Sequence, residues 1–286
     1  MSTFGRLPVV LFRLAAFGSG LLTIAVFLLM LFLGWPLLSG GQFVHLIAEE
    51  WSPDRGLYGV FPMVIGSIAI ALLALCFSLP ISLGTSFVAA TLAPRPLRRC
   101  LLAMVRFMAG IPTVVYGFVA VFLLVPFMRE HLTGGSGLNI LTASMILALL
   151  IAPTMIVFFV GGLGSVEKSF CLAVDGLGGT KVQKLLYLQL PQAWPAMVAG
   201  VVMGLGRAMG DTLISLMLAG NSVAVPHAAI DSGRTLTAHI ALVIAADFSS
   251  MEFKSIFAAG MILYVFSSVV VVVLRLFTGM AMRPTG

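Results

Sequence analysis

The segment from Gly204 to Asn221 reads GLGRAMGDTLISLMLAGN and places two opposite charges, Arg207 and Asp211, four residues apart in an otherwise apolar stretch. The composition of the chain tells us what surrounds these charges. Of its 286 residues, 60% are hydrophobic and 9% are charged, and the mean hydropathy is +1.14. These values lie far outside the range of soluble domains. The chain is therefore predicted to be a polytopic membrane protein, with both charges inside or beside lipid.

Six stretches are long and apolar enough to cross a bilayer, which takes roughly 20 residues in a helix. The predicted fold is therefore all-α, with about six transmembrane helices. The first is a retained helix from Leu11 to Leu33, because its apolar run is longer than the core of a signal peptide and no small-residue cleavage site closes it. The others lie within Gly56 to Pro94, Phe107 to Met128, Leu132 to Val166, Pro195 to Ala219 and Ser255 to Leu274.

The basic residues predict the orientation, because Lys and Arg in short loops stay on the cytoplasmic side. With the N-terminus inside, only four of them fall outside: Arg55, Arg129, Arg234 and Lys254. Both termini are therefore predicted to be cytoplasmic. The net charge of +6 follows from this inside bias. No basic arm, zinc-finger spacing or aromatic platform accompanies it, so nucleic acid is not expected as a partner.

Outside the spans, the sequence predicts little further structure. We divide the chain into residues 1–57, an N-terminal transmembrane helix with an outer loop, and residues 58–286, the core. The run TLTAHIALVIAA, Thr235 to Ala246, is too short to cross and is predicted to be a re-entrant or interfacial helix with Thr235 as its N-cap. The three cysteines form no pair or metal motif. The four histidines, scattered in or near outer loops, are interpreted as solvated or interfacial.

The longest cytoplasmic segment, residues 165–192, is predicted to form two short helices. Gly178 and Gly179 break it, and Thr180 with Gln183 makes a capping box that starts a second helix. Pro191 is expected to interrupt the helix before the next span. Apolar and charged residues alternate along both halves, so the segment is either an interfacial helix lying on lipid or a docking element for another protein.

The same segment resembles the signature loop of ABC importer permeases, in which E-A-A-x-x-x-G is followed at a fixed interval by an apolar residue, Leu and Pro. In that family this loop is the coupling helix, which sits in a cleft of the cytoplasmic ATPase. Leu172 stands where the family usually has its glutamate, and Asp175 is the candidate substitute. The resemblance implies a coupling loop at 165–192 whose docking residues are Ala173, Val174, Asp175, Gly178, Leu190 and Pro191.

Two further blocks narrow the resemblance. GIPTVVYGFVAVFLLVP, Gly110 to Pro126, and GRAMGDT with the following LAGN and TLTAHIAL are similar to the membrane subunits of the phosphate-specific ABC importer, the PstC and PstA type. Asp211 replaces the glutamate usual in the second block. The likeness runs from about Tyr58 to Leu276, and implies the type I ABC importer permease fold in the cytoplasmic membrane of a bacterium or archaeon.

The resemblance also implies partners. These are a second permease subunit, identical or different, a dimeric cytoplasmic ATPase and an extracytoplasmic phosphate-binding protein. The sequence contains no G-x-x-x-x-G-K-[ST] phosphate cradle. We therefore expect this chain to be a transporter subunit that binds no cofactor and hydrolyses no ATP, with ATP and Mg²⁺ on the partner ATPase.

Arg207 is predicted to lie about 12 residues into the fifth span, near the bilayer midplane, with Asp211 one turn further on the same face. An arginine at that depth costs roughly 2.5–3.5 kcal/mol on insertion scales and must face protein or water. Two pairs of glycines, Gly200 with Gly204 and Gly206 with Gly210, are typical of helices packed inside a bundle.

Two interpretations of this pair stay open. Arg207 and Asp211 could neutralise each other or pair with another span. Alternatively, Arg207 binds a passing oxyanion through its planar fork, Asp211 orients it, and Thr212 and Asn221 line the same substrate pathway.

Other functions are weighed against phosphate import. A permease for molybdate, tungstate or sulfate would share the coupling loop. An ion-coupled secondary transporter would be expected to carry an inverted repeat, which the sequence lacks. An intramembrane enzyme would need paired acids or a Ser/His or metal array, and Asp211 is the only acid within the predicted spans.

Overall fold

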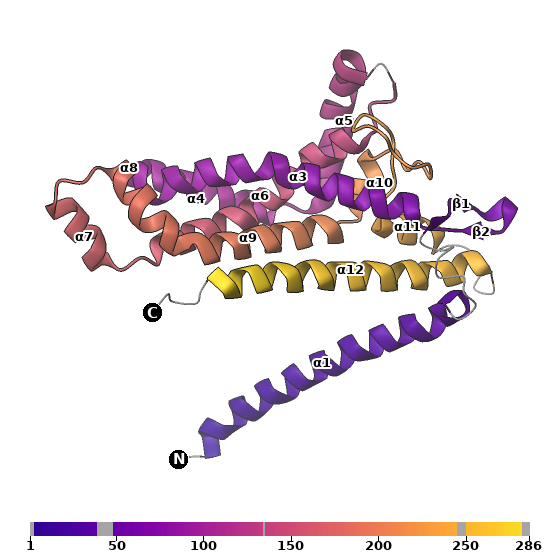
Figure 1. Ribbon diagram of the computed structural model, residues 1–286, viewed down its shortest axis with the longest axis horizontal. Helices are drawn as coiled ribbons and strands as arrows, with labels where there is room; N and C mark the ends of the chain where they lie inside the picture. The colour runs from indigo at the N-terminus through magenta and orange to yellow at the C-terminus, as the bar shows by residue number, and fades with distance from the viewer. Residues whose placement is uncertain (1–2, 39–47, 134, 245–249, 282–286) are drawn as a thin grey trace.

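The computed structural model describes residues 3–38, 48–133, 135–244 and 250–281, and it places them mainly in long helices that run side by side (Figure 1). Six helices are long and apolar enough to cross a membrane, which confirms the predicted all-α fold with six spans. Their candidate spans are Val9–Trp35, Phe61–Leu92, Thr113–Leu132, Ile140–Gly164, Lys181–Gly210 and Met251–Val270.

The elements follow one another along the chain with short connections. Three of the helical segments, η2, η3 and η4, are π-helical, and η1 is a 3₁₀ turn. In chain order the elements are α1 (Thr3–Leu38), β1 (Trp51–Ser52), η1 (Pro53–Arg55), β2 (Leu57–Tyr58), α3 (Phe61–Phe87), η2 (Val88–Leu92), α4 (Arg95–Gly110), α5 (Thr113–Met128), η3 (Arg129–Thr133), α6 (Ile140–Gly164), α7 (Lys168–Gly176), α8 (Lys181–Gln183), η4 (Lys184–Gln189), α9 (Leu190–Gly210), α10 (Leu213–Leu218), α11 (Leu236–Val243) and α12 (Met251–Ala281).

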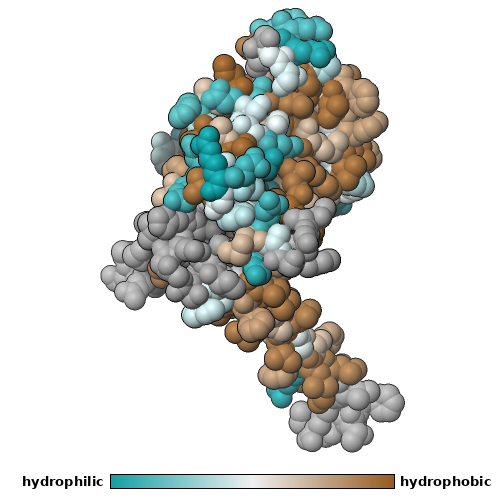
Figure 2. All heavy atoms as spheres, turned by 90° about the vertical axis from the view of Figure 1, so that its right-hand side faces the viewer, coloured by the Kyte–Doolittle hydropathy of each residue, from teal (hydrophilic) through white to brown (hydrophobic). Residues whose placement is uncertain are grey.

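The two ends of the bundle differ in character. The start of α1, the end of α12 and the pair α7 and α8 lie at one end, which is the cytoplasmic end by the distribution of basic residues (Figure 1). The antiparallel hairpin β1–β2 and α11 lie at the opposite, outer end. Figure 2 looks onto this outer end, where hydrophilic residues gather, while hydrophobic residues cover the flank and most of the visible part of α1. An even number of spans keeps both ends of the chain on one side, as predicted.

Helix α6 forms the centre of the bundle. Its fully buried side chains recur every fourth residue, which places them in one row along the helix. This row packs against α3 on one side and α9 on the other. Its members are Leu147, Ile151, Met155, Phe159 and Leu163.

Helix α9 approaches α6 closely because two of its residues have no side chain. A Cβ on Gly204 would lie 2.8 Å from Cγ of Met155, and a Cβ on Gly200 would lie 2.8 Å from the ring of Phe159. The predicted role of these two glycines in packing is thereby confirmed. Gly206 and Gly210 have no described atom within 4 Å of the equivalent position, so this second pair makes no packing contact within the described chain.

The contact between α3 and α6 uses small polar side chains. Ser78, Ser82 and Ser86 are fully buried, and Ser82 donates a hydrogen bond to the carbonyl of Ala152 on α6 at 3.4 Å. Small residues allow helix backbones to approach in a membrane, where no hydrophobic force drives helices together. Helix α9 thus packs against two helices, α3 and α6, that are themselves tightly packed.

Helix α1 packs along α12, away from the centre of the bundle (Figure 1). Gly34 of α1 meets the backbone of Ala258, and Phe27 meets Tyr264 with ring centroids 5.0 Å apart. Most of its described side chains are exposed, among them Phe12, Phe17 and Phe32. The division of the chain after residue 57 stays a prediction.

The structure corrects the start of the third span. The sequence placed it at Phe107, but α4 contains Phe107 and ends at Gly110, and the span begins at Thr113. Pro112 explains the boundary, because a proline pushes the residue before it, Ile111, into an extended conformation.

The fifth span also differs from the prediction. Pro191 does not interrupt it; instead one helix runs from Lys181 to Gly210 through the π-helical segment η4. A proline would collide with the carbonyl four residues earlier in a regular α-helix, and the wider π turn lies directly before Pro191. The helix then ends at Gly210, nine residues before the predicted Ala219, because Asp211 is extended and begins a separate helix, α10.

We expect Gly204→Val to destabilise the bundle and Gly206→Val to leave it largely intact. The added atoms at residue 204 would overlap Met155, and overpacking of this kind costs about 1–3 kcal/mol. The measurement is membrane abundance together with the midpoint of thermal unfolding in detergent. Equal midpoints for the two variants would contradict the packing of α9 on α6.

Candidate transport pathway and coupling loop

Arg207 lies on α9, three residues before the helix ends, and its side chain is partly buried. Its Nη1 donates a hydrogen bond to Oγ1 of Thr154 on α6 at 3.0 Å. Within the described part of the chain, this hydroxyl is the one hydrogen-bond acceptor that the guanidinium contacts. The positive charge is therefore anchored by a neutral group.

The contact with Thr154 shows where along α6 the charge lies. Thr154 lies 14 residues after the start of α6 at Ile140 and 10 residues before its end at Gly164. At 1.5 Å per residue these are roughly 21 Å from the outer end of α6 and 15 Å from its cytoplasmic end. The guanidinium of Arg207 thus contacts α6 near the middle of that span, and its depth in the membrane stays a prediction.

Asp211 has a different partner from the one expected. Its side chain is 9% exposed, and its Oδ2 accepts a hydrogen bond from the backbone N–H of Ile214 at 2.8 Å. Its backbone is extended, with φ −75° and ψ 126°. An N-cap residue has this conformation, and its side chain accepts a hydrogen bond from the N–H three residues later, as Asp211 does from Ile214. Asp211 therefore caps α10.

The predicted arrangement of Arg207 and Asp211 on one helix face is wrong. A spacing of four residues aligns two side chains only while the helix continues, and α9 ends between them at Gly210. Among the described residues, no carboxylate forms an ion pair with Arg207. A direct ion pair between Arg207 and Asp211 is therefore excluded, although Asp211 stays near enough for the two charges to interact.

Thr212 and Asn221 lie at opposite ends of α10. Thr212 directly precedes the helix, and its side chain makes no capping bond. Asn221 follows the helix in a left-handed conformation, φ 57°, and its Nδ2 donates to the carbonyl of Leu216 at 2.6 Å. Of the four predicted pathway residues, only Asp211 and Thr212 thus lie in the break between α9 and α10, while Arg207 lies on α9 and Asn221 lies beyond α10.

Arg234, whose side chain is held in place by Asn221, is a residue of this region that the sequence did not predict. Its Nε and Nη2 donate to the backbone carbonyl of Asn221 at 3.1 and 2.8 Å. Its Nη1 lies 3.5 Å from Nδ1 of His239. The sequence indicates only an outer-loop charge at Arg234. The contact could not be predicted from neighbouring residues, because the carbonyl that binds Arg234 lies 13 residues away in the chain.

His239 is fully buried within the protein, which corrects its interpretation as a solvated or interfacial residue. Its ring meets Trp51 edge-on with centroids 4.3 Å apart, and its Nε2 has no hydrogen-bond partner among the described residues. The apolar residues on both sides of it, Ala238 and Ile240, were the available signal. His131 and His227 are exposed as predicted, and His45 lies outside the described residues.

Helix α11 is seated against the break that follows α9. Thr237 donates from Oγ1 to the carbonyl of Asp211 at 2.9 Å, and the N–H of Leu236 donates to Oγ of Ser67 on α3 at 2.9 Å. Thr235 is the predicted N-cap and accepts from the N–H of Ala238. A short, non-spanning helix was predicted here; α11 is that helix, and its first residues are buried against the bundle.

The outer connection beside this site is fixed by Asp231. Its Oδ2 accepts hydrogen bonds from the backbone N–H groups of His227 and Ala228 at 2.9 and 2.8 Å. These donors favour the ionised form and lower the pKa of the Asp231 carboxyl. The carbonyl of Asp231 in turn accepts from the N–H of Ile140, the first residue of α6.

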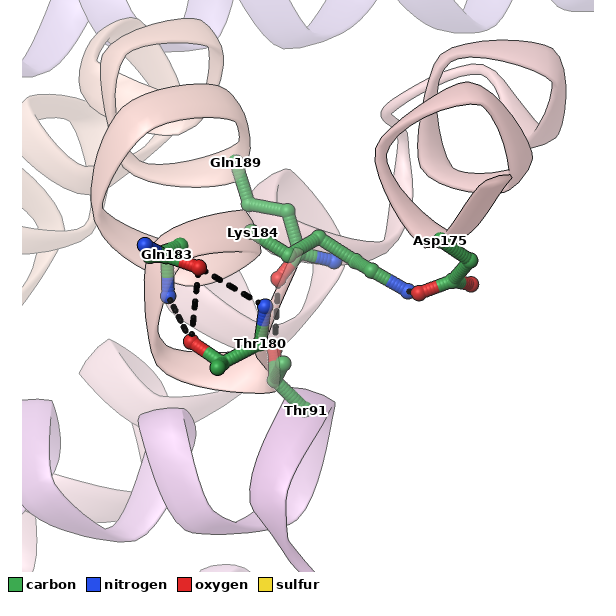
Figure 3. A network of polar contacts seen from close by, with 6 residues as sticks. All are labelled: Thr91, Asp175, Thr180, Gln183, Lys184 and Gln189. Carbon is green, nitrogen blue, oxygen red and sulfur yellow. Dashed lines mark hydrogen bonds and ion pairs between the residues drawn. The ribbon is translucent and has the colours of Figure 1, made fainter. Parts of the chain in front are cut away.

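The coupling loop forms the first of the two predicted short helices, whereas the predicted second one, α8, is the start of the continuous helix from Lys181 to Gly210. Helix α7 ends at Gly176, Gly178 has φ 76°, and the capping box between Thr180 and Gln183 starts α8 (Figure 3). Only glycine adopts that φ without strain. Large apolar side chains stand out from this loop, including Leu172, 68% exposed, and Leu177, 88% exposed.

The predicted docking residues separate into two groups. Ala173, Asp175 and Gly178 are exposed, and Val174 is partly buried. Leu190 and Pro191 instead start α9, where Leu190 packs on the core. Asp175 pairs with Lys184 of η4 at 2.5 Å (Figure 3).

Residues 82–280 match the family described as the binding-protein-dependent transport system inner membrane component. The chain belongs to this family. It is the membrane component of an ABC transporter, a multi-pass protein of the cytoplasmic membrane, and not the catalytic subunit. The permease is 30% identical over 261 residues to the phosphate transport system permease protein PstC of Xylella fastidiosa, covering 84% of this chain and 79% of that protein.

A second relative and a solved structure agree with this assignment. The phosphate transport system permease protein PstC of Pasteurella multocida is 28% identical over 278 residues, covering 90% of the permease and 86% of that protein. A chain of the inward-facing methionine ABC transporter MetNI has a TM-score of 0.63 at 16% identity, covering 81% of the permease and 99% of that chain. That likeness confirms the predicted type I importer permease fold.

The GIPTVVYG block of the permease lies beside α10, the helix that follows the break after α9. The hydroxyl of Tyr116 donates to the carbonyl of Met108 at 3.0 Å, bridging the break between α4 and α5. Gly117, the last residue of the block, lies against the side chain of Met217 on α10. Among the described residues, no group of three or more His, Cys, Asp or Glu side chains is placed to hold a metal ion.

The capping role of Asp211 predicts a difference between two substitutions. Asp211→Asn keeps an oxygen that can accept from Ile214, whereas Asp211→Ala removes it and should cost about 1 kcal/mol. We expect a lower thermal unfolding midpoint in detergent for the alanine variant only. Equal midpoints for both variants would show that the cap does not stabilise α10.

Proposed function

We propose that this permease, together with a second permease subunit, forms the membrane channel of an ATP-driven importer for inorganic phosphate. An extracytoplasmic phosphate-binding protein delivers the anion to the outer end. A dimeric ATPase binds the coupling loop and supplies the energy, with ATP and Mg²⁺ bound on the ATPase and no cofactor on the permease.

The observation that carries the proposal is that Arg207, near the middle of the bundle, forms no ion pair with a carboxylate among the described residues. A carboxylate would cancel this charge, but the residue that anchors it, Thr154, is neutral. The remaining N–H groups of the guanidinium are available to a ligand, and a planar fork suits the oxygens of a tetrahedral oxyanion. A charge at this depth is costly unless it faces protein or water, so intramembrane arginines mark transport pathways.

The choice of phosphate is supported by the relatives. The PstC proteins named above are phosphate transport permeases, and each aligns over most of its length with this chain. The break after Gly210 adds to the support, because irregular backbone at membrane depth is tolerated where it lines a cavity or is buried in protein.

The coupling loop supports an ATPase as the energy source. Its exposed apolar side chains, Leu172 and Leu177 among them, form a protruding surface of the kind that docks into a protein cleft. Leu172 occupies the position at which the family's signature usually has a glutamate. Docking at this position therefore depends on apolar contact and not on a charge.

Substitution of Arg207 tests the pathway. Arg207→Gln should lower phosphate uptake by about tenfold or more, since hydrogen bonds to a charged group contribute roughly 1.5–3 kcal/mol. Arg207→Lys keeps the positive charge but lacks the planar guanidinium, so its phosphate uptake should lie between that of the wild type and that of Arg207→Gln. The measurement is uptake of radiolabelled phosphate by cells that depend on this transporter, normalised to membrane abundance.

The matched control is Arg98→Gln, which removes an exposed arginine of α4, and should transport normally. Normal uptake by Arg207→Gln at normal abundance would end the assignment of Arg207. Competition between phosphate and molybdate in the wild type decides the substrate. Stronger inhibition of uptake by molybdate than by unlabelled phosphate would favour the other-oxyanion permease.

Gly178 tests ATPase docking. A side chain at φ 76° is strained, so Gly178→Val should distort the turn and release the ATPase during affinity purification of the permease. Gly176→Val is the control, because residue 176 has no positive φ and open space around it. Full co-purification of the ATPase with Gly178→Val would count against docking at this loop.

A further inference from the structure

Two π-helical segments meet at the cytoplasmic end of the bundle. Segment η2 continues α3, and η4 connects α8 to α9. Thr91 of η2 donates from Oγ1 to Oε1 of Gln189 of η4 at 2.5 Å, and Gln189 is buried (Figure 3). Because π turns are rare and concentrate at functional sites, a direct bond between two of them calls for an explanation beyond packing.

The same η4 segment also holds the coupling loop. Nζ of Lys184 lies 2.5 Å from Oδ1 of Asp175 on α7, and the two side chains are 14% and 52% exposed. Figure 3 shows the Lys184 side chain reaching from η4 across to α7. Segment η4 is therefore joined by side chains to α7 on one side and to η2 on the other.

The ion pair closes across the glycine-rich turn of the loop. Between Asp175 and Thr180 the chain reads GLGG, residues 176–179. Glycine-rich backbone transmits a displacement poorly because its φ and ψ are loosely restrained. The Asp175–Lys184 contact bypasses this stretch and connects α7 directly to the helix that carries Arg207.

A structural role alone does not account for the pair. A half-exposed ion pair contributes about 0–1 kcal/mol to stability, which is too little to hold α7 in place. The position of the Asp175–Lys184 pair is more informative than its stability. Lys184 lies five residues before Gln189 on the same short segment, η4. A movement of α7 would reach both α9 and α3 through these two residues.

We propose that Asp175, Lys184, Gln189 and Thr91 form a coupling junction that carries movement of α7 to the spans α9 and α3, with Lys184 as its central positioning residue. This inference rests on the proposed function, in which an ATPase moves α7. It reassigns Asp175 from an ATPase contact to an internal brace, which leaves the exposed apolar residues of the loop for docking.

The test uses charge reversal in the intact transporter, purified through a tag on this permease and reconstituted in proteoliposomes. Asp175→Lys and Lys184→Asp should each lower phosphate transported per ATP hydrolysed by about tenfold, within the range of known coupling energies. The double variant Asp175→Lys/Lys184→Asp restores the pair and should recover most of this ratio. Lys181→Asp makes the same charge change on an exposed neighbour and should behave as wild type.

Four outcomes overturn the junction. Normal coupling in both single variants is one, and a double variant no better than Lys184→Asp is another. Loss of the bound ATPase from either single variant would assign the pair to docking. A wild-type complex that contains no ATPase or transports no phosphate would refute the proposed function itself, which separates that failure from the first three.

The α3 arm of the junction has its own test. Thr91→Val removes the hydroxyl that Gln189 accepts from, and should lower transport per ATP while ATP hydrolysis continues. Thr91→Ser keeps the hydroxyl and should couple normally. Equal ratios in the two variants would remove Thr91 and Gln189 from the junction.

Discussion

Lipid hydrocarbon contains no water, so a polar group that enters it must find its partner within the protein. For Arg207 that partner is the hydroxyl of Thr154, and the contact exists because α9 lies close against α6. The close approach depends in turn on Gly200 and Gly204, which leave room for Phe159 and Met155. Because Gly200 and Gly204 have no side chain, α9 can lie close enough to α6 for Thr154 to bind Arg207.

A hydroxyl anchors the guanidinium without cancelling its charge. Asp211 could have done so, but its carboxylate caps α10 and its backbone carbonyl binds Thr237 of α11. Arg207 therefore forms no ion pair with a described carboxylate, and it lies beside the break that follows α9. Further out, Arg234 is held in the same manner by the backbone carbonyl of Asn221. In both places a neutral oxygen positions an arginine, which suits a route that an anion enters and leaves.

One continuous helix joins the two functional regions. It begins in the coupling loop at Lys181 and ends at Gly210, three residues beyond Arg207. A rigid helix transmits movement along its axis, whereas the loop before it is rich in glycine. The side-chain bonds of η4 lie where the glycine-rich loop meets the continuous helix.

Much of this architecture could be predicted from neighbouring residues. The six spans follow from hydropathy, and the turn at Gly178 and the capping box of Thr180 and Gln183 follow from conformational preference within a few residues. Two predicted helix boundaries were wrong: the third span begins at Thr113, and the fifth ends at Gly210. Both depend on a proline or a capping aspartate that ends a helix inside an apolar run. Hydropathy does not detect such a break because the residues on both sides are equally apolar.

The sequence by itself determined the class of protein and the number of spans, and it predicts their direction and the depth of Arg207, since all of these are properties of contiguous residues in a known solvent. Only the tertiary structure decided the partners of Arg207, Asp211, Asp175 and His239, and which glycines pack. The partner of Arg207, for example, lies 53 residues away in the chain. Such contacts depend on how helices are rotated and seated against one another, and that is set by the side chains of several helices at once.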